Sequence, residues 1–351
     1  MKRNLFLIFF LSVTSLIAFP VDFLWDIDFS ATFDNREGDG KHSAAETYFL
    51  TGLSPEVGIK FTDKDRIMGG AVWIQPVENT IKNGRIYPTL YYRHEGEKWK
   101  FSMGMFPMSQ LREPLPGFLW SDSLTYFQKN LRGALVQFQN QNGFFDAYID
   151  WRGIQSKNQR EAFNIVFHGE AQLKNKMLLT GGYALLNHLA KSAENNEGQF
   201  VVDNLMFNPY LGLDLTQKVN LDSLTLKAGA VIGLDRDRKN GKWEVPAGFL
   251  MEIMGEWKFL GLRNSLYAGG KLFPLYGQFG SLLYQGEPYY SSSFYDRLDI
   301  YGKIYQNQYV ELEAQLNFNF TKSNFMFYQR LLLNVNIGNF GSHALKKKKE
   351  N

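Results

Sequence analysis

The stretch Phe23-Leu-Trp-Asp-Ile-Asp-Phe-Ser-Ala-Thr-Phe33 alternates apolar and polar side chains. Its odd positions carry Phe, Trp, Ile, Phe, Ala and Phe, whereas the even positions from Asp26 onward carry Asp, Asp, Ser and Thr. A period of two residues is that of a β-strand with one apolar and one polar face. A tilted strand that crosses a bilayer needs about 9–11 residues, whereas strands of soluble sheets average about 5–6. The stretch therefore predicts a strand that crosses a membrane.

The same pattern returns along the whole chain. In residues 310–320, for example, Val, Leu, Ala, Leu, Phe and Phe alternate with Glu, Glu, Gln, Asn and Asn. No comparable helical period follows the N-terminal segment. About sixteen such segments can be counted, at residues 23–33, 46–61, 66–75, 85–94, 98–106, 131–139, 144–152, 160–172, 177–187, 204–216, 224–234, 243–258, 263–273, 295–305, 309–320 and 325–338.

The connections between these segments alternate between short and long. Turns such as 62–66 and 140–143 are interleaved with mostly longer stretches, at 34–45, 107–130, 188–203 and 274–294. Short periplasmic turns and longer outer loops are typical of outer-membrane barrels. The sequence therefore predicts an all-β fold, a transmembrane antiparallel up-and-down β-barrel of about 16 strands, within the range 14–18.

Tryptophan placement gives a second test of this prediction. Six of the seven tryptophans fall at strand ends on the apolar face, where indole rings form belts at the headgroup depth. The predicted aromatic girdle comprises Trp25, Trp73, Trp99, Trp151, Trp243 and Trp257. A mere preference of aromatic residues for strands does not explain this position at the ends.

Composition and the N-terminus indicate export. Lys2 and Arg3 precede an apolar run from Leu5 to Ile17, which is typical of a signal peptide and too short to span a membrane comfortably. The chain has no cysteine, which excludes disulfides, thiolate metal sites and cysteine nucleophiles. Its net charge of +3 gives no field that would favour nucleic acid. We expect a signal peptide at 1–18, an outer-membrane barrel at 19–340 and a basic tail at 341–351.

On this pattern the chain resembles the porins of Gram-negative bacteria. The resemblance covers the mature chain and includes no diagnostic motif. It implies a barrel of 16 to 18 strands whose long third outer loop folds into the lumen, a position that residues 107–130 occupy. The chain departs from porins at its end, because porins usually finish on an aromatic residue, whereas Phe340 is followed by Gly-Ser-His-Ala-Leu and by Lys346 to Lys349.

The candidate functional residues are charged side chains at the alternate strand positions that face the lumen, here called positions of inward parity. Across a ring of about sixteen strands, an acidic group and a basic group would largely face each other over a wet lumen, creating a transverse field. The alternative is that a wet wall simply carries mixed charges that pair locally. The predicted pore-lining residues are acidic Asp26, Asp28, Asp299, Glu311 and Glu313, and basic Lys60, Arg93, Lys98 and Lys100.

Two long loops are further candidates. Residues 107–130 contain three prolines and several apolar side chains that would be costly to expose, so this loop is predicted either to fold into the lumen or to pack over the rim. As a constriction loop it would present Arg112, Glu113, Trp120 and Asp122. The loop 274–294 is predicted to be a packed lid rather than a sugar-stacking surface; its aromatic residues include Tyr276, Phe279, Tyr284, Tyr289 and Tyr290.

No catalytic motif is present, and the five histidines are scattered; His188 and Ser192 form only a weak pair. We therefore expect no enzyme activity, no cofactor and no metal site. The predicted function is a porin for passive diffusion of small hydrophilic solutes across the outer membrane. The alternative is an occluded barrel that binds a ligand or partner through its outer loops. Expected partners are outer-membrane lipid, lipopolysaccharide and small hydrophilic solutes. The sequence leaves open whether the chain forms a homo-oligomer.

Overall fold

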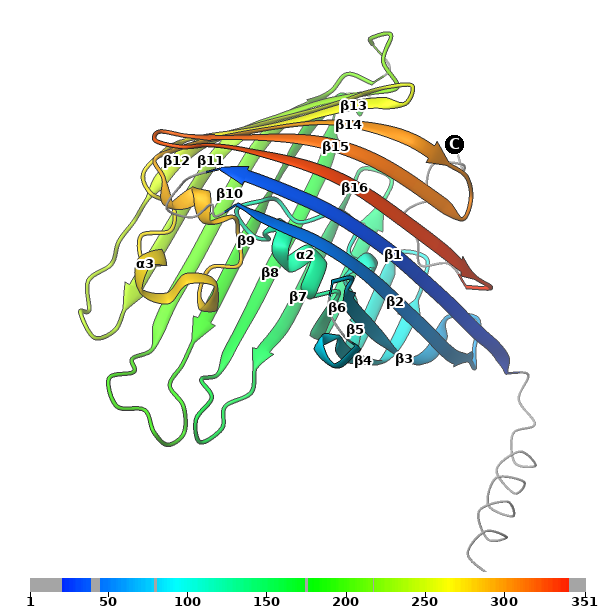
Figure 1. Cartoon of the computed structure of the whole chain (residues 1–351), viewed down its shortest axis with the longest axis horizontal. Coiled ribbons are helices and arrows are strands. Elements are labelled where there is room, and N and C mark those ends of the chain that lie inside the picture. The colour runs from blue at the N-terminus through cyan, green and yellow to red at the C-terminus, as the bar shows by residue number, and fades with distance from the viewer. Residues whose placement is uncertain (1–20, 39–44, 79–80, 174–175, 217, 341–351) are drawn as a thin grey trace, which may run out of the picture.

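The computed structural model describes residues 21–38, 45–78, 81–173, 176–216 and 218–340. Within these residues sixteen antiparallel strands form one closed barrel, in which each strand pairs with its neighbours in sequence and β1 pairs with β16 (Figure 1). The strands are Asp22–Gly38 (β1), Glu46–Lys60 (β2), Asp65–Pro76 (β3), Arg85–Glu95 (β4), Trp99–Pro107 (β5), Asn130–Asn140 (β6), Gly143–Gly153 (β7), Ala162–Leu173 (β8), Leu178–Leu189 (β9), Val202–Asp214 (β10), Ser223–Asp237 (β11), Ala247–Trp257 (β12), Leu260–Gly269 (β13), Phe294–Gln306 (β14), Val310–Thr321 (β15) and Phe325–Gly338 (β16).

The predicted fold class and strand number are therefore confirmed. β1 begins and β16 ends at the same end of the barrel, and the longer loops extend from the other end (Figure 1). The predicted signal peptide at 1–18 and the basic tail at 341–351 lie outside the described residues. No helix among the described residues is long and apolar enough to cross a membrane.

Within the described parts of the chain, the short helical elements all lie in loops. Ile81–Asn83 (η1) lies between β3 and β4; Met108–Gln110 (η2) and Asp122–Phe127 (α2) lie between β5 and β6. The loop between β13 and β14 contains Tyr276–Phe279 (α3), Gly280–Leu282 (η3) and Pro288–Ser291 (η4).

The outer wall of the barrel is apolar and its inner wall is polar. Phe23, Val57 and Leu316 are exposed on the outside, whereas the residues next to them in sequence, such as Gln315 and Asn317, are buried in the lumen. The exposed large apolar side chains therefore form a face suited to lipid, while the polar side chains face inward. This is the alternation predicted from residues 23–33.

Several strand bounds differ from the prediction. β1 extends to Gly38 rather than ending at residue 33. β12 begins at Ala247 rather than at residue 243, because Pro246 lacks the N–H needed for a ladder and only an isolated bridge joins Asp235 to Glu244. β13 begins at Leu260, directly after a two-residue turn in which Lys258 has a positive φ of 54°. Leu272 and Phe273, predicted at the end of a strand, lie buried in the following loop.

Candidate functional site in the barrel lumen

The loop between β5 and β6 enters the lumen. In its first part the side-chain carbonyl of Gln110 accepts hydrogen bonds from Arg93 Nη1 and Ser102 Oγ, both at 2.6 Å. Gln137 Nε2 donates to the backbone oxygen of Gln110 over 3.1 Å. Because all three wall residues face inward from β4, β5 and β6, the loop runs against the inner wall rather than over the rim.

The second part of this loop is anchored on a different wall. The carboxylate of Asp122, the first residue of α2, accepts hydrogen bonds from Arg297 Nη1 of β14 at 2.9 Å and from Arg330 Nη2 of β16 at 2.5 Å. Tyr126 donates its hydroxyl hydrogen to Asp34 of β1 over 2.9 Å. Charge-assisted hydrogen bonds of this kind are the strong ones, so α2 is held firmly inside the barrel (Figure 1).

The loop between β13 and β14 folds inward as well and meets the first loop. The backbone N–H of Ser121 donates to the backbone carbonyl of Gln285 over 2.8 Å. The backbone N–H of Asp122 donates to Glu287 Oε1 over 2.7 Å. Tyr284 donates its hydroxyl hydrogen to Asp235 of β11 over 2.6 Å. The aromatic residues of this loop are therefore packed inside, which agrees with the predicted lid. Together the two loops bridge the lumen.

Two neighbouring acids at this junction have opposite protonation tendencies. Burial and the nearby charge of Asp122 raise the pKa of Glu287 to about 7. Burial alone would raise the pKa of Asp122 as well, but the positive charges of Arg297 and Arg330 outweigh that effect and lower it well below its usual range. The junction thus holds one permanently ionised carboxylate and one that can titrate near neutral pH.

The predicted acidic residues all lie on the inner face of the wall. Asp26 and Asp28 accept from the side-chain amide of Asn336, and Glu313 accepts from Gln315 Nε2 at 2.6 Å. Asp299 pairs with Arg297, and Glu311 accepts from Gln306 Nε2 near the strand end.

Three of the four predicted basic residues also lie on the inner wall. Lys60 lies at the rim, with its Nζ 3.4 Å from Asp63. Arg93 contacts Glu95 at 2.8 Å, and the half-buried Lys100 is the register partner of Glu95. Lys98, predicted to lie on a strand, lies instead exposed in the turn before β5. The closed strand order also puts the two charge groups on neighbouring arcs, since only β2 and β3 separate β1 from β4. Most members of the two groups therefore do not face each other from opposite walls; Asp299 of β14 and Lys100 of β5 are the members farthest apart around the ring.

The remaining predicted residues divide between the lumen and the outer wall. Arg112 Nε lies 3.7 Å from Asp146, Glu113 is half-buried on the lumen side, and Trp120 is buried in the loop. The six girdle tryptophans all lie on the outer side; Trp25, Trp99 and Trp257 are near one rim and Trp73, Trp151 and Trp243 near the other. Trp243 precedes β12 rather than lying in a strand.

The arginines that hold α2 were not among the residues predicted from the sequence. Arg36 pairs with Asp34 at 2.8 Å, and Arg297 and Arg330 bind Asp122. Arg330 has inward parity in a strand that was predicted correctly, so its wall position was available from the sequence. Its partner in a distant loop was not.

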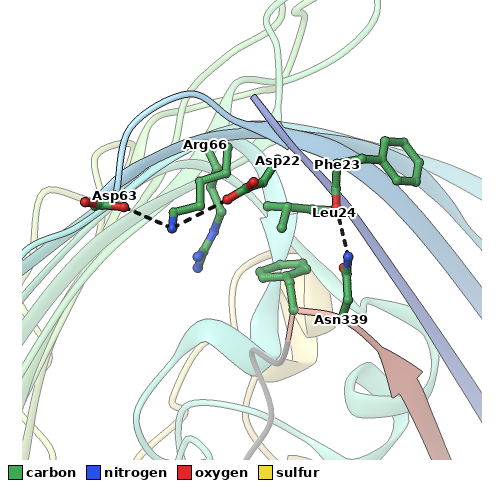
Figure 2. Close-up of a pocket in the computed structure, with 8 residues that line it drawn as sticks. Asp22, Phe23, Leu24, Asp63, Arg66 and Asn339 are labelled. Atoms are coloured by element: carbon green, nitrogen blue, oxygen red, sulfur yellow. Dashed lines mark hydrogen bonds and ion pairs between the residues drawn. The ribbon is translucent and has the colours of Figure 1, made fainter. Parts of the chain in front are cut away.

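A cavity lies at the end of the barrel where β1 begins and β16 ends. It measures about 520 Å³ and is lined by residues that include Lys60, Arg66 and Phe340. Figure 2 shows Asn339 reaching Phe23, whose carbonyl accepts from Asn339 Nδ2 at 2.8 Å, while the Phe23 ring points away. Arg66 lies over the Phe340 ring at 4.5 Å. The chain thus turns inward after β16, so Phe340 packs inside the mouth.

The histidines do not assemble a nucleophilic triad within the described parts of the chain. His188 Nδ1 lies 3.9 Å from Asp203, but the Ser192 hydroxyl donates to the Glu194 carbonyl at 2.6 Å. His94 lies 2.7 Å from Asp65, and the Thr62 hydroxyl donates to that same carboxylate. The described residues also contain no group of three or more His, Asp or Glu placed to hold a metal ion.

The fold is similar to that of several solved proteins of Pseudomonas aeruginosa, among them the outer membrane protein OpdK. OpdK matches with a TM-score of 0.54 and 10% identity, over 90% of this chain and 99% of that chain. OccK2 (OpdF), solved in complex with glucuronate, matches with a TM-score of 0.53 and 9% identity, over 91% and 99%. OpdQ matches with a TM-score of 0.51 and 10% identity, over 91% and 98%. The chain therefore has a porin-like fold, that of an outer-membrane protein.

No curated protein matches the sequence. One family model does, over residues 23–341, and its description is lipid A 3'-O-deacylase-type. The matched region begins and ends with the barrel itself. On that match the chain belongs to the lipid A 3'-O-deacylase-type family.

Proposed function

We propose that this protein is an outer-membrane channel for passive diffusion of small hydrophilic solutes, narrowed by its two inward loops. The observation that carries the proposal is the inner wall, which bears ionisable and amide side chains from one rim to the other in a ring of sixteen strands. Barrels of this size leave an aqueous lumen, and such a wall is stable only when it is wet or paired.

The narrowing comes from the meeting of the two loops. The hydrogen bonds from Ser121 and Asp122 to Gln285 and Glu287 join them, while Asp122 and Tyr284 tie them to the wall. A solute would pass beside this bridge and then beside the charged arcs of the other half. Small hydrophilic solutes are accordingly the proposed partners, and outer-membrane lipid with lipopolysaccharide surrounds the apolar wall.

The family description suggests a second candidate, hydrolysis of an acyl ester on lipid A. The observation in its favour is the His188–Asp203 pair on the outer wall. Ser192, however, is bound to backbone carbonyls and has no contact with His188 among the described residues. A site that uses a serine nucleophile needs the serine hydroxyl within hydrogen-bond reach of its base, which Ser192 is not, so we place this function below transport.

Single-channel recording in a planar bilayer tests the proposal. We expect steady open conductance from the full chain after refolding in detergent, and uptake of small sugars into swelling liposomes. A barrel that inserts without conductance would overturn the channel and favour the occluded receptor. In parallel, mass spectrometry of lipid A incubated with the protein should show an unchanged number of acyl chains; loss of one chain would establish the hydrolase instead.

A further inference from the structure

One lysine on the inner wall is held by a carboxylate from a strand three positions away in the ring. Lys227 Nζ of β11 lies 2.6 Å from Glu170 Oε2 of β8. The two side chains can meet because Gly181 of β9 and Gly212 of β10 place no side chain between them. A Cβ at Gly181 would lie 2.7 Å from the Tyr210 hydroxyl, and one at Gly212 would lie 3.2 Å from Lys227 Cγ. The two glycines therefore allow this ion pair to form inside the lumen.

Two more carboxylates lie close to this lysine. Glu252 of β12 is the register partner of Lys227, and Glu113 of the loop between β5 and β6 adds its negative charge from the lumen side. Both carboxylates are half-buried, and neither makes an ion pair or a hydrogen bond with another residue that the structure describes. The next cation, Arg112, is already beside Asp146. Two negative charges in this section are therefore left without a counter-charge, which is costly away from bulk water.

Solvent reaches this section from the end of the barrel where β1 begins. Met254, the inward residue that follows Glu252 on β12, is 51% exposed, and Lys227 itself is 19% exposed. The carboxylates are not placed to share one metal ion, since no group of three or more His, Asp or Glu among the described residues could hold one. A matching ligand therefore carries its positive charges apart from each other.

Aromatic and apolar side chains line the same section. Tyr183 of β9 lies among the three carboxylates, and its ring stacks on that of His168 with centroids 3.9 Å apart and an interplanar angle of 8°. The stack holds the Tyr183 ring in one orientation. Leu111 and Leu115, which flank Glu113 in the loop, are partly buried against the apolar cluster. Ring faces attract ammonium groups, and the leucines suit methylene groups.

We propose that this section of the lumen binds organic dications, in which a short methylene chain separates two ammonium or guanidinium groups. One cationic group would pair with Glu113 and the other with Glu252, through charge-assisted hydrogen bonds. The methylene chain would pass Tyr183 and the two leucines. The inference names a solute class for the channel and in that respect rests on the proposed function. It predicts that the barrel prefers such solutes over neutral and anionic ones of the same length.

Isothermal titration calorimetry on the detergent-solubilised full chain at low salt tests the site without requiring conduction. The probes are cadaverine, glutarate and the diol with the same carbon chain, which carry positive, negative and no charge. We expect cadaverine to bind at least about tenfold more tightly than either of the others, the lower end of the enrichment that charged clefts produce. Equal binding of all three probes, or no binding of cadaverine, would overturn the proposal.

Substitutions locate the binding. Glu113→Gln with Glu252→Gln should weaken cadaverine binding by at least about tenfold, since hydrogen bonds to charged groups are among the strongest single contacts. Glu113→Gln alone, in the loop, should weaken it measurably if the double variant folds poorly. The matched control is Glu97→Gln with Glu194→Gln, which removes two exposed carboxylates outside the barrel wall. Unchanged affinity in the folded variants, or an equal loss in the control, would contradict the assignment.

Recording in a planar bilayer separates this inference from the proposed function. Cadaverine should interrupt the current in brief blocks, and the blocks should shorten in the double variant. Specific binding of cadaverine to a barrel that does not conduct would contradict the channel and leave the site standing. Steady conductance that cadaverine does not block, together with no specific binding, would overturn the site and leave the channel standing.

Discussion

Leu316 and Met254 illustrate how one residue's parity decides its environment. Leu316 is 42% exposed on the outer wall of β15, whereas Met254 has inward parity on β12 and is exposed to the lumen. The alternation of residues 310–320 is sufficient to predict that Leu316 lies on the outer wall. Parity of this kind depends only on local sequence, which explains why the inward position of Asp26, Asp299 and Glu313 could be predicted.

Exchange of Leu316 for arginine tests the two walls. Leu316→Arg places a charge on the lipid face near the middle of its strand and should lower the free energy of unfolding by roughly 2–4 kcal/mol. The control Met254→Arg places the same side chain in the lumen and should cost much less. Urea titrations of the barrel in vesicles, followed by the heat-dependent shift in gel mobility, give both values. Equal losses would mean that the walls are wrongly assigned.

Partners of single residues could not be predicted in the same way. The pairing of Asp122 with Arg297 and Arg330 joins positions more than 170 residues apart in sequence. No local pattern encodes such a contact, because it depends on the path of a loop through the closed barrel. Lys98 was misplaced for the opposite reason, since the exact start of β5 decides whether it belongs to a strand or to a turn.

At the scale of elements, the strands were far more predictable than the loops. Most strand bounds agree within about two residues, because period-two alternation runs through each strand. β12 and β13 deviate where Pro246 and the turn at Lys258 interrupt the ladder. For residues 107–130 the prolines and apolar residues left two alternatives open, lumen or rim. Only the contacts with Arg93, Arg297 and Arg330 decide for the lumen.

Removing the anchor of α2 should loosen this loop. Asp122→Asn takes away the charge that Arg297 and Arg330 share, although Asp299 and Asp34 still neutralise them in part. We expect a loss of about 1.5–3 kcal/mol, the range for hydrogen bonds to charged groups, together with higher and noisier single-channel conductance. The control Ser123→Ala removes only the weaker contact with Arg36 Nη1 at 3.2 Å. Identical recordings for both variants would show that Asp122 does not anchor the loop.

The junction of the two loops should depend on pH through Glu287. Its pKa of about 7 in the folded protein exceeds the ordinary value near 4.5. The folded state therefore binds the proton more tightly, so the junction gains stability as pH falls from about 7 to 4.5 and loses it as pH rises over that range. Hydrogen exchange of residues 117–122, corrected for the intrinsic rate, should show greater protection at pH 5.5 than at pH 7.5. Glu287→Gln should remove that difference, and a difference that persists would assign the titration to another group.

At the scale of the whole molecule, the charges of the half nearer the termini form two adjacent arcs. Acidic Asp26, Glu56 and Glu313 come from β1, β2 and β15, and basic Arg66 and Arg93 come from β3 and β4. Because the arcs are neighbours, part of their field cancels where they meet, and the rest points along the wall. A solute that enters from this end would meet the mouth near Arg66 and Phe340 before it reaches the loops.

Neutralising part of the acidic arc should change ion preference. Glu311 and Glu313 lie within the first four residues of β15, at the end where the termini lie, and Glu311→Gln with Glu313→Gln removes two negative charges without changing side-chain size. The reversal potential under a salt gradient should shift toward anions. The shift should be large near 0.01 M salt, where the Debye length is about 30 Å, and should vanish near 1 M, where it is about 3 Å. The control Glu97→Gln with Glu194→Gln removes two exposed carboxylates outside the barrel wall and should shift it little. An unchanged reversal potential in a conducting barrel would mean that ions pass along another part of the wall. The residues that set ion preference would then be those of the loop junction around Asp122 and Glu287.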